Sequence, residues 1–467
     1  MVLQDDNAYF KVRVAVLVNS LKNRFDELTS RDFPNSSPNE VIALIKQALT
    51  AIGEQVKVAD GKILPLIFSL LRTYQEVLSY LDNAHTEQTP RGLVRILRDL
   101  LNRVSAGARF VASPQSAYNY GIVDVQPYLV TPLTNLLPAS ELHALPPISL
   151  SRIHLILFPR AERDNILVHA VFGHEIGHLI ATEFLSEEEN EPDFQTGFQS
   201  VLEQISKTDP APPETDPMAV LRRRAEIANR VAQIRKRAME ELISDYVGAM
   251  LFGPSALLAS YEIFLLNPID LVPSGSDLYP PSRYRLRFLL DAIEKEGFIN
   301  ALTQCGAADA SCSAHMASAL THFQRIAAIV ADQTDLNALK SDVLIDAAYG
   351  WVKNSLEKAK AFVRKRLDQD LIYPVDAFRG EVPELIGRLV LNVPPSELGI
   401  YPKVTLPTWQ SALLAGWFVR IHGKRQTNDG EVMFGVAEHD AIQRLVLRAV
   451  ENIGLHKEYL EHMAGAV

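Results

Sequence analysis

The stretch that decides the expected fold lies at residues 168–181 and reads Val168-His-Ala-Val-Phe-Gly-His-Glu-Ile-Gly-His-Leu-Ile-Ala181. Its apolar residues predict a helix, and residues 174–178 form the pattern H-E-x-x-H. Residues four apart lie on the same helix face, one turn above each other. The spacing therefore places the imidazoles of His174 and His178 close enough to bind one metal ion.

Glu175 adds the group that hydrolysis requires. Its side chain lies about 100° round the helix from that of His174, so its carboxylate can reach a water on the metal without being a ligand. In zinc hydrolases, histidine nitrogens hold the ion and a nearby carboxylate takes a proton from the bound water. The pattern favours a catalytic zinc site. The alternative is a pair of helix histidines that face a polar groove.

A third ligand is predicted some sixty residues further on, in the helical segment Glu240-Glu-Leu-Ile-Ser-Asp-Tyr-Val-Gly-Ala249. Glu241 and Asp245 are four residues apart and so share a helix face. Glu241 is the expected third zinc ligand, and Asp245 is expected to bond the far nitrogen of a ligand histidine and fix its tautomer. Glu240 is a weaker candidate, because its spacing to Asp245 does not place the two on one face.

These segments resemble those of the gluzincin metallopeptidases. Residues 241–245 are similar to the E-x-x-S-D segment of the thermolysin type. Residues 241–249 also resemble the E-x-x-A-D-x-x-G-A segment of the prenyl-protein (CAAX-type) and heat-shock-type group, and the gap from His178 to Glu241 fits that group better. Members of this group are usually membrane proteins, whereas this chain is expected to be soluble. The resemblance spans about residues 150–295.

The resemblance implies a role for each residue of the motifs. His174, His178 and Glu241 would bind Zn²⁺, Glu175 would be the general base, and Asp245 would orient a ligand histidine.

A further similarity concerns the donor that stabilises the transition-state oxyanion. Residues 279–285 read Tyr279-Pro-Pro-Ser-Arg-Tyr-Arg285 and resemble the H-P-P-x-x-x-R segment of the same group, with Tyr279 in place of the histidine. Besides the metal, such a reaction needs a hydrogen-bond donor aimed at the oxyanion. The candidates are Tyr279, Tyr284 and Arg285, and among the catalytic residues we count Tyr279 and Arg285 with Glu175.

Composition excludes several other classes of protein. The net charge of −10 argues against a nucleic-acid binder, which needs a basic excess. The basic clusters at 222–224 and 235–237 lie in Glu-rich helical patterns and are interpreted as solvated helix faces. The two cysteines, Cys305 and Cys312, exclude a disulfide-built scaffold and are expected to be free thiols. Without a signal sequence or a long apolar run, the chain is expected to be cytoplasmic, with no membrane span.

Hydrophobic periodicity predicts a mostly α protein with a small β-sheet, an α+β fold built on a zincin-like core. Strand patterns are concentrated between residues 108 and 158, and the last of them, at 152–158, is expected to hold an extended substrate through main-chain hydrogen bonds. The three expected regions are a helical N-terminal region (1–105), the metallopeptidase core (106–305) and a helical C-terminal region (306–467).

Several boundaries are predicted within and beyond the core. The motif helix is expected to begin near Asp164 as its N-cap, and residues 186–193 are expected to form a solvated acidic turn. A Pro-rich linker at 210–217 precedes a long helix over 218–252, for which Gly253 is the stop signal. Helical patterns follow at 311–366, 375–391, 406–422 and 436–464.

The sequence thus predicts a zinc metalloendopeptidase, a hydrolase that cleaves a peptide or protein substrate with Glu175 as general base. The alternative is a binding or regulatory protein that retains a structural or vestigial zinc site, with its helical flanks docking a protein partner. The presence of Glu175 counts against it, because structural zinc has no use for a base. A third reading is a metal-dependent hydrolase of a non-peptide amide.

Overall fold

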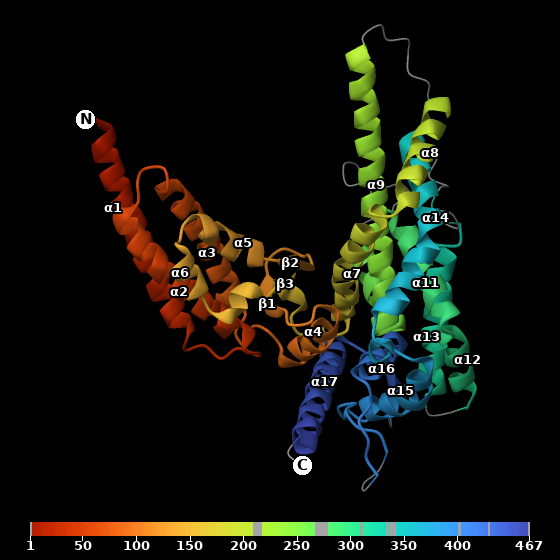
Figure 1. Ribbon diagram of the computed structural model, residues 1–467. Helices are drawn as coiled ribbons and strands as arrows, with labels where there is room; N and C mark the ends of the chain where they lie inside the picture. The colour runs from red at the N-terminus through yellow and green to blue at the C-terminus, as the bar shows by residue number, and fades with distance from the viewer. Residues whose placement is uncertain are drawn as a thin grey trace. The chain divides into compact units, whose positions relative to one another are not determined.

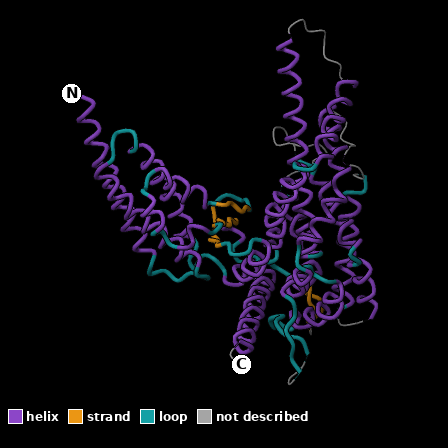
Figure 2. Tube along the Cα trace, viewed as in Figure 1, coloured by secondary structure: helices purple, strands orange, loops and turns teal. Residues whose placement is uncertain are grey.

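The structure is a computed structural model that describes residues 2–208, 217–266, 279–308, 312–332, 336, 342–399, 403–427 and 430–465. Helices account for most of these residues, and the strands form one three-stranded and one two-stranded sheet (Figures 1 and 2). The predicted fold class, mostly α with a small sheet, is therefore confirmed. The chain divides into two compact units, an N-terminal unit (Met1–Asp164) and a C-terminal unit (Asn165–Val467).

Four long helices open the N-terminal unit, where a helical region is predicted: α1 (Val2–Leu28), α2 (Ser37–Val58), α3 (Leu64–Asn83) and α4 (Arg91–Val104). Their apolar faces form one core, in which Phe25, Ile45 and Leu71 have no exposed surface. Two short helices, α5 (Gln126–Val130) and α6 (Ala139–His143), follow in the same unit. The hydroxyl of Tyr74 donates a hydrogen bond to the carbonyl of Leu129 at 3.1 Å and so ties α3 to α5.

The sheet of the N-terminal unit has β3 (Ile153–Pro159) in its centre, with β1 (Arg109–Gln115) parallel on one side and β2 (Gly121–Asp124) antiparallel on the other. Ile156, for example, is paired with Ala112 and with Ile122. The expectation that this strand holds an extended substrate is wrong, because both of its edges already form ladder hydrogen bonds. A short apolar strand pattern does not distinguish a central strand from an edge strand.

The C-terminal unit contains eleven α-helices and a hairpin among its described residues. In chain order they are α7 (Phe172–Glu189), α8 (Pro192–Thr208), α9 (Pro217–Phe252), α10 (Pro254–Leu265), α11 (Ser282–Lys295), α12 (Phe298–Ala308), α13 (Ser313–Ile329), α14 (Val343–Arg366), α15 (Val375–Val390), α16 (Trp409–His422), β4 (Lys424–Thr427), β5 (Gly430–Met433) and α17 (Val436–Gly465). The long helix ends as predicted, because Gly253 has the positive φ of 54° that stops it. The helices predicted at 375–391, 406–422 and 436–464 are confirmed as α15, α16 and α17, whereas the pattern at 311–366 corresponds to two helices, α13 and α14, and lies partly outside the described residues.

The start of the motif helix differs from the prediction. A short 3₁₀ turn (Val168–Val171) precedes α7, which begins only at Phe172. Asp164 is therefore not its N-cap. The carboxylate of Asp164 instead accepts two hydrogen bonds from the guanidinium of Arg163, at 2.7 and 3.0 Å.

The predicted acidic turn at 186–193 is shorter than expected, although most of its residues are exposed as predicted. Helix α7 continues to Glu189 and α8 begins at Pro192, and Glu188 is buried in an ion pair with Arg235 of α9 at 2.6 Å. The guanidinium of Arg235 lies 4.1 Å from the ring centroid of Trp351 in α14, so this arginine does not belong to a solvated face either. Runs of charged residues usually lie on a solvated face. Glu188 is buried instead, because it pairs with Arg235, which lies 47 residues further along the chain.

Three further predictions concern organisation. The predicted boundaries at 105/106 and 305/306 fall inside the two compact units, and the three-part division stays a prediction. The Pro-rich segment 210–217 lies outside the described residues except for Pro217, which begins α9. Within the part of the chain that the structure describes, no helix is both long and apolar enough to cross a bilayer.

Candidate metal centre

Glycines bring α7 and α9 into backbone contact. At Gly177, the fourth residue of the H-E-x-x-H pattern, a Cβ would lie 2.5 Å from the Cα of Ser244. At Gly173 a Cβ would lie 2.9 Å from the Cα of Gly248. Any larger side chain would separate the two helices. This close approach places His174 and His178 of α7 against Glu241 of α9.

One carboxylate faces both histidines. Oε2 of Glu241 lies 3.4 Å from Nε2 of His174, and its Oε1 lies 4.0 Å from Nε2 of His178. The two imidazole centroids are 4.7 Å apart, with the rings nearly perpendicular. All three residues therefore converge from two helices, although they are 67 positions apart at most.

Glu175 completes a second group of converging atoms. His174, Glu175 and His178 each offer one ligating atom, and these atoms all lie within 4.8 Å of one another. Burial raises the pKa of the Glu175 carboxyl, the largest of the effects on it. A raised pKa makes the carboxylate a better proton acceptor near neutral pH.

The donor set fits zinc. Tetrahedral zinc takes nitrogen at about 2.0–2.1 Å and carboxylate oxygen at about 2.0–2.2 Å, which puts neighbouring ligand atoms about 3.4 Å apart. The His174–Glu241 separation of 3.4 Å has this value, and the His178–Glu241 separation of 4.0 Å is somewhat wider. Two imidazoles and one carboxylate leave the fourth position of a tetrahedron open.

Asp245 lies behind the first histidine. Its Oδ1 is 2.8 Å from Nδ1 of His174, the contact that the sequence analysis expects of this residue. Burial alone would raise the pKa of Asp245, but the Arg285 guanidinium and the hydrogen bonds from Arg285 and His174 outweigh it and lower that pKa. The ionised carboxylate therefore accepts the Nδ1 proton and leaves Nε2 turned towards Glu241.

Arg285, on α11, binds both carboxylates. Its Nε and Nη2 donate to the two oxygens of Asp245 at 2.8 Å, and its Nη1 lies 2.8 Å from Oε2 of Glu241. All three nitrogens of the guanidinium are thus engaged by acidic side chains. This geometry favours a role in holding Glu241 and Asp245 over donation to a substrate oxyanion.

The charges of the ligands follow from these contacts. Burial would raise the pKa of Glu241, but Arg285 and His174 lower it to about 2, so this carboxylate is ionised. Burial and the neighbouring His174 lower the pKa of His178 to about 4, so its imidazole is neutral, as a metal ligand requires. Burial works against protonation of His174, but Asp245 and Glu241, one on each ring nitrogen, raise its pKa to about 9.

The two tyrosine candidates for the oxyanion donor lie among other partners. The ring of Tyr279 lies under the guanidinium of Arg237, 4.9 Å from its carbon, and its carbonyl accepts a hydrogen bond from Tyr349 at 3.3 Å. The ring of Tyr284 stacks on Phe288, with centroids 6.5 Å apart. The assignment of an oxyanion donor to Tyr279 or Tyr284 stays a prediction.

Sequence reasoning missed the bond between Arg285 and the two carboxylates. The signal was present, because two acids four apart on a buried helix require a cation. It also missed Gly173, Gly177 and Gly248, whose spacing of small residues on α7 and α9 indicates a close helix contact. Glu240, the weaker ligand candidate, pairs with Arg237 on its own helix at 3.4 Å.

Comparisons of the chain with protein-family models, with curated proteins and with solved structures give no match. The functional interpretation therefore rests on the residues and the geometry of the site.

Proposed function

We propose that this protein is a zinc-dependent metallopeptidase of the gluzincin type. The observation that carries the proposal is the position of Glu241, whose two oxygens face the Nε2 atoms of His174 and His178 from a different helix. Glu175, the remaining acid of the group, lies beside the same histidines. Three ligands and a free base are the minimum set for hydrolysis by this class of enzyme.

Two glutamates compete for the third ligand position, and we assign it to Glu241. Its carboxylate is ionised and held by Arg285, so its oxygens are fixed relative to both histidines. Glu175 follows His174 directly on α7 and points about 100° away from it round the helix. That direction suits a base that reaches a water molecule.

The chemistry divides between the metal and the chain. Zinc, when bound, polarises the scissile carbonyl and lowers the pKa of water toward about 7. Glu175 removes a proton from the attacking water and passes it to the nitrogen of the leaving amine, so that the peptide bond breaks. His174, His178 and Glu241 hold the ion, and Asp245 keeps His174 in the tautomer that presents Nε2.

The proposal extends the sequence-based expectations about context. We place the activity in the cytoplasm and take its substrate to be a peptide or a protein. The helical flanks, residues 1–105 and 306–467, are the surfaces on which we expect a protein partner to dock.

A proteome-wide cleavage comparison tests the proposal. Wild type and Glu175→Gln are each incubated with cell lysate, and new peptide termini are counted. We expect cleavage by wild type, loss of cleavage with Glu175→Gln, and about one zinc per chain in both. Glu187→Gln is the matched control, because Glu187 is an exposed glutamate on the same helix. If Glu175→Gln retains the biological activity, a binding or regulatory protein with a vestigial zinc site replaces the peptidase.

A further inference from the structure

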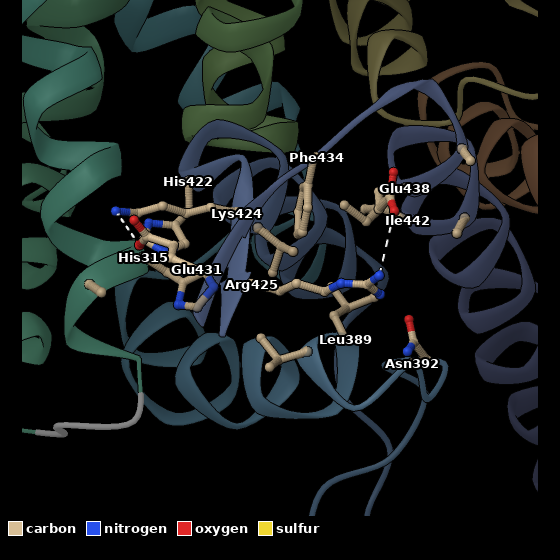
Figure 3. Close-up of a pocket in the computed structure, with 15 residues that line it drawn as sticks. His315, Leu389, Asn392, His422, Lys424, Arg425, Glu431, Phe434, Glu438 and Ile442 are labelled. Atoms are coloured by element: carbon tan, nitrogen blue, oxygen red, sulfur yellow. Dashed lines mark ion pairs between the residues drawn. The ribbon is translucent and has the colours of Figure 1, made fainter. Parts of the chain in front are cut away.

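The C-terminal unit contains a second candidate site, a pocket of about 440 Å³ (Figure 3). Its walls come from α13, the end of α15, α16, the β4–β5 hairpin and the start of α17. Binding sites for small molecules occupy roughly 300–1,000 Å³. None of the residues that line this pocket belongs to the metal centre, so the pocket is a separate site.

One histidine that lines the pocket has no hydrogen bond from its ring to any residue that the structure describes. His315 is 7% exposed, and neither of its ring nitrogens has a hydrogen-bond partner among the described residues. Burial and the neighbouring His422 lower the pKa of His315 to about 4, so its ring is neutral at pH 7. His422 already has a hydrogen-bond partner, because its Nδ1 lies 2.9 Å from the hydroxyl of Ser318. Of the two histidines, His315 is therefore the one whose ring nitrogens are left for a ligand.

A neutral imidazole has one N–H donor and one nitrogen acceptor. A peptide group is its complement, with a carbonyl oxygen that accepts and an N–H that donates. Leaving the ring nitrogens of a buried imidazole unpaired is unfavourable, and a bound amide group satisfies one of them, through its carbonyl oxygen or its N–H.

The charged residues of the pocket are balanced. Lys424 forms an ion pair with Glu431 at 2.6 Å, and Arg425 lies 3.6 Å from Glu438. In Figure 3, Lys424 and Glu431 are grouped with the two histidines, whereas Glu438 lies on the other side of Phe434. The Arg425–Glu438 separation is longer than a hydrogen bond, so the guanidinium keeps its donors for a ligand. A pocket lined by both positive and negative side chains suits a ligand that also carries a positive and a negative charge.

The rest of the lining is largely apolar, with Leu389, Val419, Phe434 and Ile442 among its members. We propose that this pocket binds a short peptide with free termini and an apolar side chain. The backbone amide bonds His315, the carboxylate bonds Arg425, and the side chain lies against the apolar residues. An anion such as phosphate, which carries no positive charge, suits the pocket less, because the carboxylates of Glu431 and Glu438 line it and would repel the anion. The inference does not depend on the metal centre.

Calorimetric titration of the full-length chain tests the ligand class. The zinc-supplemented chain carries Glu175→Gln, so that turnover does not consume the probe. The probe is the dipeptide leucyl-leucine, compared with N-acetyl-leucyl-leucinamide, which lacks both charges, and with inorganic phosphate. We expect the free dipeptide to bind about tenfold more tightly than the blocked one. Equal binding of the blocked dipeptide, or binding of phosphate alone, overturns the proposal.

Substitutions in the pocket test its location. Arg425→Gln is expected to weaken dipeptide binding about tenfold, because a charge-assisted bond is lost. The matched control is Arg448→Gln, an exposed arginine on α17 that pairs with Glu451 at 3.1 Å and does not line the pocket. Unchanged binding in Arg425→Gln overturns the proposal. So does loss of binding in Glu241→Ala alone, which would place the dipeptide in the metal centre.

His315→Leu separates a ligand-binding role from a structural one. Leucine has a similar volume but neither a donor nor an acceptor. Because the ring nitrogens of His315 have no hydrogen-bond partner among the described residues, we expect the Tm of the ligand-free chain to be equal or higher, while dipeptide binding weakens about tenfold. A lower Tm together with unchanged binding shows that the histidine serves the fold and contradicts the proposal.

Discussion

Asp245 and His174 show how a single contact sets the state of a proposed metal ligand. The carboxylate lies 2.8 Å from Nδ1, and the same ring presents Nε2 to Glu241. An acceptor on Nδ1 fixes a proton there. Because the pKa of His174 is raised to about 9, a metal would have to displace the second proton, on Nε2, to bind that nitrogen. The residue that orients the ligand therefore matters almost as much as the ligand.

Asp245→Asn tests this orienting role. The amide keeps the shape of the side chain but loses the charge, so we expect zinc affinity to fall roughly tenfold to a hundredfold. Competition with a zinc chelator of known affinity measures the change. An unchanged zinc affinity would reject the orienting role. Glu240→Gln is the control, because Glu240 is an acid on the same helix that pairs with Arg237.

Arg285→Gln tests the cation that neutralises the site. Glu241 and Asp245 would both remain buried without their partner, and breaking a buried pair of this kind costs about 3–5 kcal/mol. We expect a loss of that order in the free energy of unfolding, measured with urea, and weaker zinc binding. Arg287→Gln is the control, because Arg287 pairs with Asp291 on the surface of the same helix. A loss no larger than in that control would show that Arg285 does not stabilise the carboxylates.

At the scale of elements, the site exists because α7 and α9 touch along their backbones. The glycine of the H-E-x-x-H pattern is part of this packing, since a Cβ at Gly177 would meet the backbone of Ser244. With Glu241 as the proposed third ligand, the ligands come from both helices. The proposed metal centre therefore depends on the packing of the helix pair.

Gly177→Ala tests the helix contact. The added methyl group forces the helices apart, and overpacking of this kind costs about 1–3 kcal/mol. Because the histidines then move away from Glu241, zinc binding is expected to fall as well. Gly380→Ala on α15 is the matched control, since nothing lies within 4 Å of its Cβ position, and alanine there is expected to be neutral or stabilising by about 0.5–1 kcal/mol. Equal stability of the two variants would contradict the close packing.

At the scale of the whole molecule, the residues of the candidate site all come from one of the two compact units. His174, His178, Glu241 and Arg285 all lie in the C-terminal unit, whereas the three-stranded sheet lies in the N-terminal unit. A ligand that binds only the folded form stabilises the part of the chain that holds it.

Zinc addition is therefore expected to stabilise the C-terminal unit. At a concentration about 100-fold above Kd the gain is about 2.7 kcal/mol, and a chelator should reverse it. Hydrogen exchange followed by mass spectrometry would show slower exchange in α7, α9 and α11 and no change in α1–α3. In Glu241→Ala the effect of zinc should disappear. Zinc-induced protection confined to α1–α3 would place the metal elsewhere.

Local patterns predicted much of the helical architecture, because apolar periodicity, glycine stops and the i, i+4 rule act within one element. They also selected His174, His178, Glu241 and Asp245, since each pair lies on one turn of one helix. They failed where a partner comes from far along the chain. The buried pair of Glu188 with Arg235 and the central position of β3 are examples.

The sequence by itself thus determined the helical class and the two halves of the candidate site. Each half is a pair of residues on one helix, His174 with His178 on α7 and Glu241 with Asp245 on α9. Only the tertiary structure decided that the halves meet, that Arg285 lies on both carboxylates, and that a pocket forms around His315. The physical reason is that side-chain convergence depends on how helices pack. That packing follows from the summed fit of many residues, here including the glycines between α7 and α9, and no single stretch of sequence encodes it.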